Sequence, residues 1–199
     1  LAAPRAGESV LDACAGSGGK TTHLAALMKN EGRIAALDCD ADKILQLKQE
    51  AARLGVTNIE TFRADLTRAL DSVFTEKFNR VLVDAPCSGT GTLRRNPEIK
   101  WRLSESDLQI LSQTQVDILH HASNAVQKGG LLIYSTCSLL PFENDETLRR
   151  FLREHLDFTP EANGGNLPAG LTDHRGFLRT YPHRHAMDGF FAAVLRRRN

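Results

Sequence analysis

The chain reads SVLDACAGSGGKT over residues 9–21, where a short apolar run leads into a glycine-rich turn and then into an amphipathic stretch. The same succession recurs along the chain, with apolar runs alternating with stretches whose apolar residues recur at helical spacing. Such alternation is typical of a parallel sheet covered by helices on both faces. Residues 9–21 therefore predict the first strand, loop and helix of an open α/β sheet.

Further elements follow from the same periodicity. Predicted strands cover residues 9–13, 33–38, 59–64, 80–84 and 131–136, and predicted helices cover 21–29, 41–54, 104–127 and 144–155. Ser104 is the expected cap of the third helix, and Gly129-Gly130 its stop signal. Residues 177–181 and 189–195 predict two strands close enough in sequence to form an antiparallel pair at one edge. The expected fold is α/β and Rossmann-like, with a mostly parallel seven-stranded sheet and an antiparallel edge strand.

Length and composition indicate a single soluble domain over residues 1–199, with 41% hydrophobic and 25% charged residues. No apolar run reaches the roughly 18 residues of a membrane span, and the first residues do not form a signal peptide. We therefore expect a cytoplasmic protein without a membrane partner. The four cysteines are too scattered for a disulfide framework and lack C-x-x-C spacing, so we expect free thiols and no metal site.

The glycine-rich turn has two ligand-binding interpretations besides that of a purely structural tight turn. A P-loop is indicated by Gly19-Lys20-Thr21, but that motif needs a glycine five positions before Gly19, where this chain has Cys14. The other interpretation is an adenosine-type cofactor, which glycines at the carboxyl ends of parallel strands allow to approach the backbone.

Acids at the ends of four successive strands favour the second interpretation. They are Asp12, Asp38, Asp65 and Asp84, and Asp38 follows Gly16 by 22 residues, a spacing suited to binding ribose hydroxyls. Carboxylates suit the sulfonium and the ribose of S-adenosylmethionine and would repel a triphosphate. The sequence therefore predicts S-adenosylmethionine as the cofactor.

Two cysteines stand at the carboxyl ends of predicted strands, Cys87 after the fourth and Cys137 after the fifth. Buried structural cysteines are common, but a pair beside Asp84 suits methylation of a pyrimidine at carbon 5. A thiolate that adds at carbon 6 makes carbon 5 nucleophilic, and Asp84 is the candidate to stabilise the adduct near ring nitrogen 3. A nearby cation such as Lys20 favours the thiolate. These residues alone do not rank the two cysteines.

Basic residues gather in two places although the formal net charge is only +1. One cluster holds Arg94, Arg95, Lys100 and Arg102; from Arg175 onward, six arginines and two histidines face one acid, Asp188. Such clusters are candidate phosphate contacts, although a solvated surface accounts for them equally well. Trp101 has two interpretations, stacking on a base or packing in the core.

Beyond these features, the chain resembles the Sun/NSUN family of RNA (cytosine-5) methyltransferases from about Val10 to Leu195. The blocks that carry the resemblance are Asp12-Ala13-Cys14-Ala15 with Gly18-Gly19-Lys20-Thr21, Asp84-Ala85-Pro86-Cys87-Ser88-Gly89-Thr90-Gly91, Arg94-Arg95-Asn96-Pro97 with Lys100-Trp101, Tyr134-Ser135-Thr136-Cys137-Ser138, and Pro182-His183-Arg184-His185 with Asp188-Gly189-Phe190-Phe191. The two cysteine motifs in this order are specific to the family.

The resemblance implies an S-adenosylmethionine-dependent methyltransferase fold and assigns roles to individual residues. Cys137 would be the nucleophile and Cys87 would assist product release, while Lys20 and Asp84 would flank the reacting base. The implied cofactor-binding residues are Cys14, Ala15, Gly16, Ser17, Gly18, Gly19, Lys20, Asp38 for the ribose, Asp65 for the adenine side, and Asp84. The implied RNA contacts are Arg94, Arg95, Lys100, Trp101, Arg102 and Arg184.

Two departures from the family pattern carry expectations. Ser17 replaces the usual proline of the loop, so cofactor affinity should change slightly without loss of activity. The short run before residue 9 indicates that an upstream RNA-binding segment is absent, so RNA binding should be weak.

Ribosomal RNA is the expected substrate and transfer RNA the alternative, and we expect a monomer. Other interpretations are a P-loop-like NTPase, a non-catalytic RNA-binding module, and a methyltransferase for another acceptor, which would leave the paired cysteines unexplained.

Overall fold

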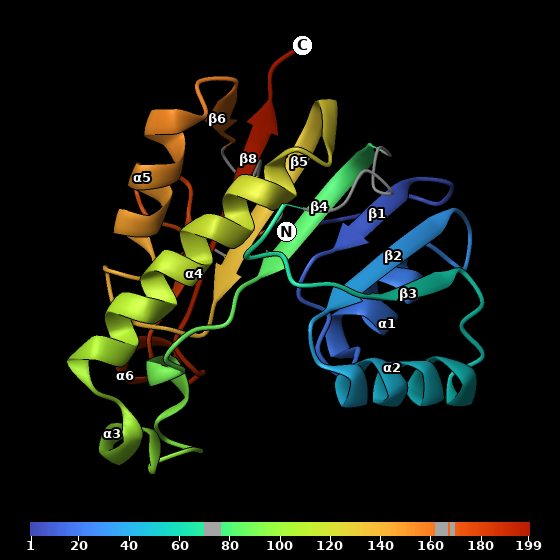
Figure 1. Cartoon of the computed structure of the whole chain (residues 1–199). Helices are drawn as coiled ribbons and strands as arrows, with labels where there is room; N and C mark the ends of the chain where they lie inside the picture. The colour runs from blue at the N-terminus through green and yellow to red at the C-terminus, as the bar shows by residue number, and fades with distance from the viewer. Residues whose placement is uncertain (70–76, 162–166, 168–169) are drawn as a thin grey trace.

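The computed structural model describes residues 1–69, 77–161, 167 and 170–199, and these residues fold around one sheet (Figure 1). Its strands are β1 (Ser9–Asp12), β2 (Arg33–Asp38), β3 (Ile59–Arg63), β4 (Phe78–Asp84), β5 (Val126–Thr136), β6 (Phe158–Pro160), β7 (Leu178–Thr180) and β8 (Phe190–Arg197). Its helices are α1 (Gly19–Leu27), α2 (Ala41–Arg53), α3 (Ile99–Arg102), α4 (Glu105–Ser123), α5 (Asp145–Glu154) and α6 (Pro182–His185), with a 3₁₀ turn, η1, at Thr90–Thr92.

The strand order is β3-β2-β1-β4-β5-β8-β6, with β7 also paired to β8. Strands β1 to β5 are parallel, and β8 runs antiparallel to β5. The α/β fold with a mostly parallel sheet and an antiparallel strand at one side is therefore confirmed. The described sheet has eight strands rather than seven, because β6 and β7 share the edge of β8 that β5 leaves open.

Alternating side chains of the strands face two helical layers. On one face Val10, Ile34 and Ile133 pack with Leu24 of α1 and with Met28, which caps that helix. On the other face the intervening residues pack against α4 and α5, as Leu11, Leu132 and Tyr134 do with Leu119 and Phe151. Figure 1 shows α4 and α5 together on one side of the sheet, with α1 and α2 on the other. This layering leaves the carboxyl ends of the parallel strands free to carry a site.

Two boundary predictions were wrong because β5 begins at Val126, before the apolar run that predicted a strand from residue 131. The helix expected to run to residue 127 ends at Ser123, and Val126 already pairs with Phe78 of β4. Gly129-Gly130 is not a helix stop, since Gly129 (φ 72°) lies within β5 where the register with β4 shifts by a bulge. Strand β6, which lies beyond α5 and ends at Pro160, also went unpredicted, because its pairing with β8 is a long-range contact.

Helix α4 begins as predicted. The Ser104 side chain accepts a hydrogen bond from the Asp107 backbone, and the Asp107 side chain accepts one from the Ser104 backbone.

No helix in the described part of the chain is long and apolar enough to cross a membrane.

Candidate active site

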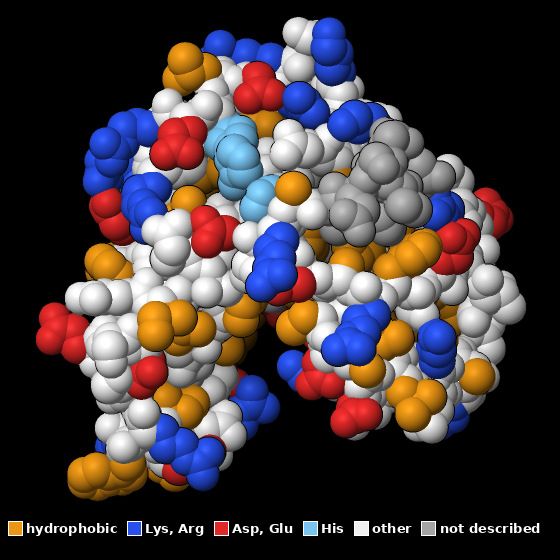
Figure 2. All heavy atoms as spheres, viewed as in Figure 1, with side chains coloured by type: hydrophobic (Ala, Val, Ile, Leu, Met, Phe, Trp, Pro, Cys, Tyr) orange, Lys and Arg blue, Asp and Glu red, His pale blue; other side chains and the backbone are white. Residues whose placement is uncertain are grey.

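The loops that follow the parallel strands meet at one edge of the sheet and surround a cleft of about 240 Å³. Its walls come from the loops after β1 to β4 and from α4, and Figure 2 shows the molecule hollowed between the α4 side and the α2 side. The residues that line the cleft are Ala13, Cys14, Gly16, Asp38, Cys39, Lys43, Ala64, Asp65, Leu66, Thr67, Asp84, Pro86, Thr114 and Ile118.

The glycine-rich loop forms a fixed wall of this cleft. The Gly16 N–H donates to Asp38 Oδ2 at 2.9 Å, and the Ala15 N–H donates to the Leu37 carbonyl at 2.8 Å. Gly18 has a φ of +97°, and a Cβ there would lie 2.8 Å from the Leu47 side chain. A residue other than glycine at 18 would therefore force the loop away from α2.

The predicted cofactor residues divide between cleft wall and supporting structure. Cys14, Gly16, Asp38, Asp65 and Asp84 line the cleft. Ala15 and Gly18 are buried behind it, whereas Ser17 and Gly19 are exposed and do not line it. Asp12 does not line it either, contrary to expectation: it is fully buried and accepts a hydrogen bond from Thr21 Oγ1 at 2.8 Å. The expected lining of four carboxylates is therefore a lining of three.

The donors and acceptors in the cleft fit an adenosine-type cofactor. Asp38 is held by the backbone N–H groups of Gly16 and Asp40, both at 2.9 Å. The Thr67 hydroxyl donates to Asp65 at 2.7 Å, and this bond lowers the pKa of that carboxyl. The carboxylates of Asp38, Asp65 and Asp84 still outnumber Lys43 on the wall and Lys20, which pairs with Asp84 from outside it, so the cleft is acidic; this suits a sulfonium and ribose hydroxyls and disfavours a polyphosphate.

Burial gives Cys14 a passive place in the cleft wall. The thiol lies among buried groups near Asp12 and Asp38, and desolvation followed by these charges raises its pKa far above the ordinary range. It remains a neutral thiol at physiological pH and presents a small apolar surface.

An ion pair joins the ends of β4 and α1. Lys20 Nζ lies 2.5 Å from Asp84 Oδ2, and the Ser135 hydroxyl donates to Asp84 Oδ1 at 2.7 Å. Lys20 and Ser135 also line a second hollow of about 400 Å³, on the α1 face and bordered by Phe190. The Lys20–Asp84 pair therefore lies at the boundary between the two hollows, with the ammonium 5.8 Å from the centre of the Phe190 ring.

The two cysteines predicted to carry chemistry are in direct contact. Cys87 follows β4, Cys137 follows β5, and their sulfur atoms lie 3.4 Å apart. The hydrogen bond from Cys87 lowers the pKa of Cys137 to about 7; burial and Asp84 oppose this effect, and Lys20 reinforces it. The same hydrogen bond, with burial, raises the pKa of Cys87 far above its ordinary value. The pair therefore favours a thiolate at Cys137 and a neutral thiol at Cys87.

Close backbone contacts hold the cysteine loops together. The Gly91 N–H donates to the Cys137 carbonyl at 2.9 Å, and the Gly189 N–H donates to the Gly91 carbonyl at 2.8 Å. A Cβ on Gly91 would lie 2.1 Å from the Gly189 carbonyl oxygen, so the approach of these segments requires glycine at 91.

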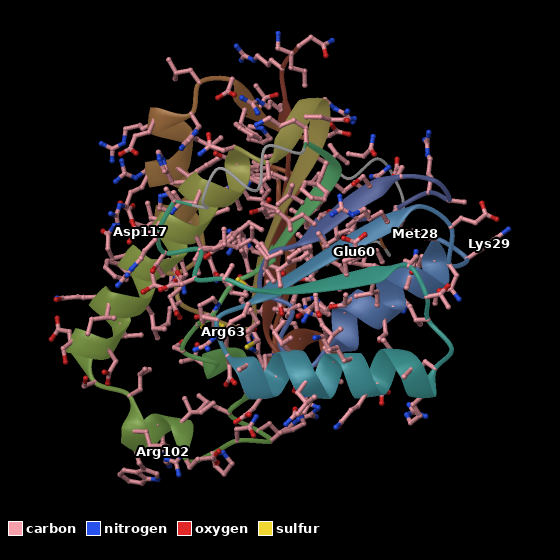
Figure 3. All side chains as sticks on the ribbon, turned by 45° about the vertical axis from the view of Figure 1, so that its right-hand side comes forward. Met28, Lys29, Glu60, Arg63, Arg102 and Asp117 are labelled. Atoms are coloured by element: carbon pink, nitrogen blue, oxygen red, sulfur yellow. The ribbon has the colours of Figure 1, made fainter. Side chains whose placement is uncertain are left out.

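The basic residues beyond Cys87 lie on an arm, built by η1, α3 and the residues between them, that projects away from the sheet (Figure 1). Trp101 is 80% exposed on α3, with Lys100 Nζ 4.7 Å from the centre of its ring, so the core-packing interpretation of Trp101 is wrong. Figure 3 shows Arg102 at the outer end of the arm, pointing away from the sheet. Arg95 pairs with Asp188, and Arg94 lies 3.8 Å from the same carboxylate, so both are partly engaged within the protein. Arg184 lies on the neighbouring α6 with its guanidinium 6.0 Å from the centre of the Tyr181 ring.

Sequence reasoning missed several residues of the site. Pro86, Thr114 and Ile118 line the cleft, and the last two come from α4, a helix that carried no motif. Glu143 lies buried behind both cysteine loops, and only its position shortly after the Cys137 motif hinted at a role. No group of His, Cys, Asp and Glu within the described ranges is arranged to hold a metal ion.

Comparison with known proteins accounts for nearly the whole chain. A family described as 16S rRNA methyltransferase RsmB/F matches residues 1–196. Relatives include a probable ribosomal RNA small subunit methyltransferase B of Bacillus subtilis, 41% identical over 198 residues, and the ribosomal RNA small subunit methyltransferase B of Shewanella oneidensis, 38% identical over 196 residues. Each match covers 98% of this chain and 44% of the relative, so the chain spans less than half the length of these curated relatives.

Solved structures agree with this match. NSun6 from Pyrococcus horikoshii, crystallised with SFG, is 29% identical with a TM-score of 0.86 and covers 98% of this chain and 49% of that one. A methyltransferase homologue from Pyrococcus horikoshii is 31% identical with a TM-score of 0.81 and covers 98% of this chain and 63% of that one.

Proposed function

Because the chain belongs to the 16S rRNA methyltransferase RsmB/F family, we propose that it methylates carbon 5 of a cytosine in ribosomal RNA, using S-adenosylmethionine and a covalent adduct at Cys137. The observation that carries the proposal is the contact between the Cys87 and Cys137 sulfurs, 3.4 Å apart beside the acidic cleft. A methyltransferase for another acceptor would have no use for two thiols in this arrangement.

The cofactor would occupy the acidic cleft. Asp38 would accept hydrogen bonds from the ribose and Asp65 would lie on the adenine side, while Gly16 on the cleft wall and Lys20 at its boundary would hold the methionine part. When bound, S-adenosylmethionine supplies an electrophilic methyl group. Pro86 and Ile118 line the same cleft as these carboxylates, so they would offer the bound cofactor apolar contacts.

Cys137 would act as the nucleophile toward the base. Its thiolate would add at carbon 6 of the cytosine, which turns carbon 5 into a nucleophile. As the adduct forms, Asp84 would relay a proton from the paired Lys20 ammonium to ring nitrogen 3, as the 2.5 Å contact between the two side chains supports. The target cytosine has to leave its stack to reach this edge, so a single-stranded or loop cytosine is the expected substrate.

Cys87 would act in release. After methyl transfer a base has to remove the proton from carbon 5 so that the Cys137 sulfur can leave. Cys87 would pass its thiol proton to the departing Cys137 sulfur and accept the carbon 5 proton in its place, a role that its hydrogen bond to that sulfur and its raised pKa support.

The arm beyond Cys87 would contact RNA. The exposed Trp101 with Lys100 beside its ring is an arrangement that stacks on bases, and Arg102 adds a phosphate contact. Arg94, Arg95 and Arg184 would contribute further contacts, in part by exchanging Asp188 for phosphate.

Methyl transfer from labelled S-adenosylmethionine to unmodified ribosomal and transfer RNA transcripts, followed by nucleoside analysis, tests the proposal. We expect label in 5-methylcytosine of ribosomal RNA. Label in transfer RNA alone would reassign the substrate, label in another nucleoside would overturn the cytosine chemistry, and cofactor binding without transfer would favour a non-catalytic RNA-binding module. Magnesium-dependent ATP binding in place of S-adenosylmethionine binding would favour the NTPase.

A further inference from the structure

A carboxylate with no part in the proposed chemistry lies behind the two cysteine loops. Glu143, just before α5, is fully buried. Its four hydrogen-bond donors in the described chain are neutral groups of Ser88, Gln115 and Ser138. Burying a carboxylate without a cationic partner costs free energy that hydrogen bonds only partly offset. A stable fold alone does not require a charge at this position, so its contacts call for another explanation.

These contacts reach the residue that follows each cysteine. The Ser88 N–H donates to Glu143 Oε1 at 2.8 Å, and the Ser88 hydroxyl donates to Oε2 at 2.5 Å. The Ser138 hydroxyl also donates to Oε2. Ser88 adjoins Cys87 and Ser138 adjoins Cys137, so a single carboxylate fixes both loops with respect to each other.

Neighbouring side chains extend the same arrangement to the preceding residues. Gln115 Nε2 donates at 3.0 Å both to Glu143 Oε1 and to the carbonyl of Pro86, which precedes Cys87. Asn144 accepts from the Thr136 hydroxyl at 2.6 Å and donates to the Ser138 carbonyl at 2.9 Å, and these two residues flank Cys137. Each cysteine is therefore held from both sides.

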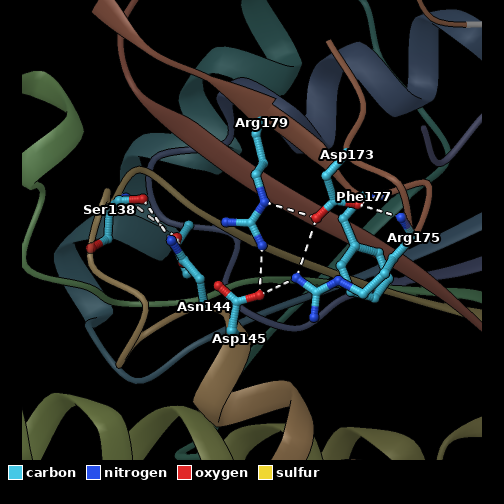
Figure 4. Close-up of polar contacts among 8 residues, drawn as sticks. Ser138, Asn144, Asp145, Asp173, Arg175, Phe177 and Arg179 are labelled. Atoms are coloured by element: carbon cyan, nitrogen blue, oxygen red, sulfur yellow. Dashed lines mark hydrogen bonds and ion pairs between the residues drawn. The ribbon is translucent and has the colours of Figure 1, made fainter. Parts of the chain in front are cut away.

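An ion-pair network anchors this segment to the C-terminal strands (Figure 4). Asp145, the first residue of α5, accepts from Arg179 at 2.6 Å and also pairs with Arg175. Both arginines contact Asp173, at 3.0 and 3.2 Å. Because the residue after Asn144 is fixed in this way, Glu143 is presented to the cysteine loops from a rigid base.

We propose that Glu143 is a positioning residue that sets the contact between Cys87 and Cys137 through Ser88 and Ser138. It touches neither sulfur, and its effect on methyl transfer rests on the function proposed above. Its effect on the thiol pair needs neither RNA nor cofactor, so the role of Glu143 and the proposed function can be tested separately.

The test is the pH dependence of Cys137 alkylation by iodoacetamide in Glu143→Gln, followed by peptide mass spectrometry. This substitution would turn an amide toward the donors of Ser88 and Ser138, so the loops should loosen and Cys137 should lose its hydrogen bond from Cys87. We expect the alkylation midpoint, near pH 7 in the unaltered chain, to rise by about one unit or more.

The sign of the shift separates positioning from simple electrostatics. Removing a negative charge without moving the loops would lower the pKa of a nearby thiol, and Asp84 and Lys20, the other charges near Cys137, are unchanged in this variant. A midpoint that stays or falls therefore overturns the proposal. If Glu143→Gln does not fold, Glu143→Asp, which is too short to reach both loops, should give a smaller upward shift.

The control is Ser123→Ala, which also removes a buried polar group, an α4 hydroxyl that donates to the His120 carbonyl at 2.7 Å and does not contact the cysteine loops through that bond. It should leave the midpoint unchanged, and an equal shift in this control would also overturn the proposal.

In the methyl-transfer assay Glu143→Gln should lower kcat about ten- to a hundredfold with little change in KM for S-adenosylmethionine. An unaltered chain that makes no 5-methylcytosine defeats the proposed function, whereas the alkylation result still decides the role of Glu143.

Discussion

The sulfur atoms of Cys87 and Cys137 lie 3.4 Å apart although fifty positions separate the two residues in the chain. The contact follows from the sheet, because β4 and β5 are parallel neighbours and Asp84 pairs with Ser135 at their carboxyl ends. Cys87 follows β4 by three residues and Cys137 follows β5 directly, so both thiols lie at the same edge. Their contact lets one sulfur keep a proton while the other carries the charge, which allows them different roles.

Replacing Cys137 by alanine should abolish methyl transfer. Without the thiolate, carbon 5 of the cytosine stays a poor nucleophile, so the rate should fall by at least roughly a thousandfold. The cleft residues Asp38 and Asp65 are unaffected, so S-adenosylmethionine should bind within about twofold of the unaltered chain, as measured by calorimetry. Substantial residual transfer would remove Cys137 as nucleophile.

Methyl transfer should depend on pH through the Cys137 thiol. Its pKa is lowered to about 7, so the reactive thiolate is present above that pH and is lost as the pH falls below it. We expect kcat/KM to rise about tenfold per pH unit below this value and to level off above it. A profile that instead keeps rising until about pH 9, where an ordinary thiol ionises, would contradict a lowered pKa at Cys137.

Replacing Trp101 by alanine should weaken RNA binding and leave stability unchanged. The side chain is 80% exposed, so its removal creates no cavity, while loss of one stacked base should cost about 1–3 kcal/mol of binding free energy. Filter binding at fixed salt measures the change. Leu156→Ala, which truncates an apolar residue of similar exposure (75%) beyond α5, is the control, and an equal loss there would argue against stacking.

Asp12→Asn should raise the free energy of unfolding, relative to the unaltered chain, more at alkaline pH than at acid pH. Burial raises the pKa of Asp12 to about 6 from an ordinary value of about 4, so the folded protein holds a proton that the unfolded chain releases between these values. The cost of ionising Asp12 is therefore full above about pH 6, at roughly 3 kcal/mol, and vanishes below about pH 4.

Urea unfolding at pH 4.5 and pH 8 measures this linkage. The free energy of unfolding of Asp12→Asn, taken relative to the unaltered chain, should be higher at pH 8 than at pH 4.5 by an amount of this order. A difference that does not change with pH would show that the carboxyl ionises in the fold as readily as in the unfolded chain.

Much of the fold was predictable because the strands are buried on both faces. Continuous apolar runs such as residues 81–83 identify these strands directly, and their parallel order places Asp84, Cys87 and Cys137 at one edge. The same runs do not reveal β6, whose three residues become a strand by pairing with β8. Nor do they reveal the bulge at Gly129, which matches a helix stop in sequence.

The site was predictable where motifs stand next to strands and not where helices or buried polar groups complete it. Sequence spacing led to Asp38, Asp65 and the two cysteines. It did not distinguish Asp12, which is buried, from the acids that line the cleft, because both kinds end a strand. Glu143 and Gln115 were missed because long-range hydrogen bonds define their role.

The central claim, covalent attack by Cys137 with release assisted by Cys87, is tested most directly by Cys87→Ala incubated with S-adenosylmethionine and unmodified ribosomal RNA. Denaturing electrophoresis should show a protein–RNA adduct, and mass spectrometry should map it to Cys137, since attack still proceeds, more slowly at neutral pH without the Cys87 hydrogen bond, while release is blocked. The Cys87→Ala/Cys137→Ala double variant should show none. An adduct that forms in Cys137→Ala and maps to Cys87 would reverse the two roles, and the absence of an adduct in Cys87→Ala with active methyl transfer would contradict the account.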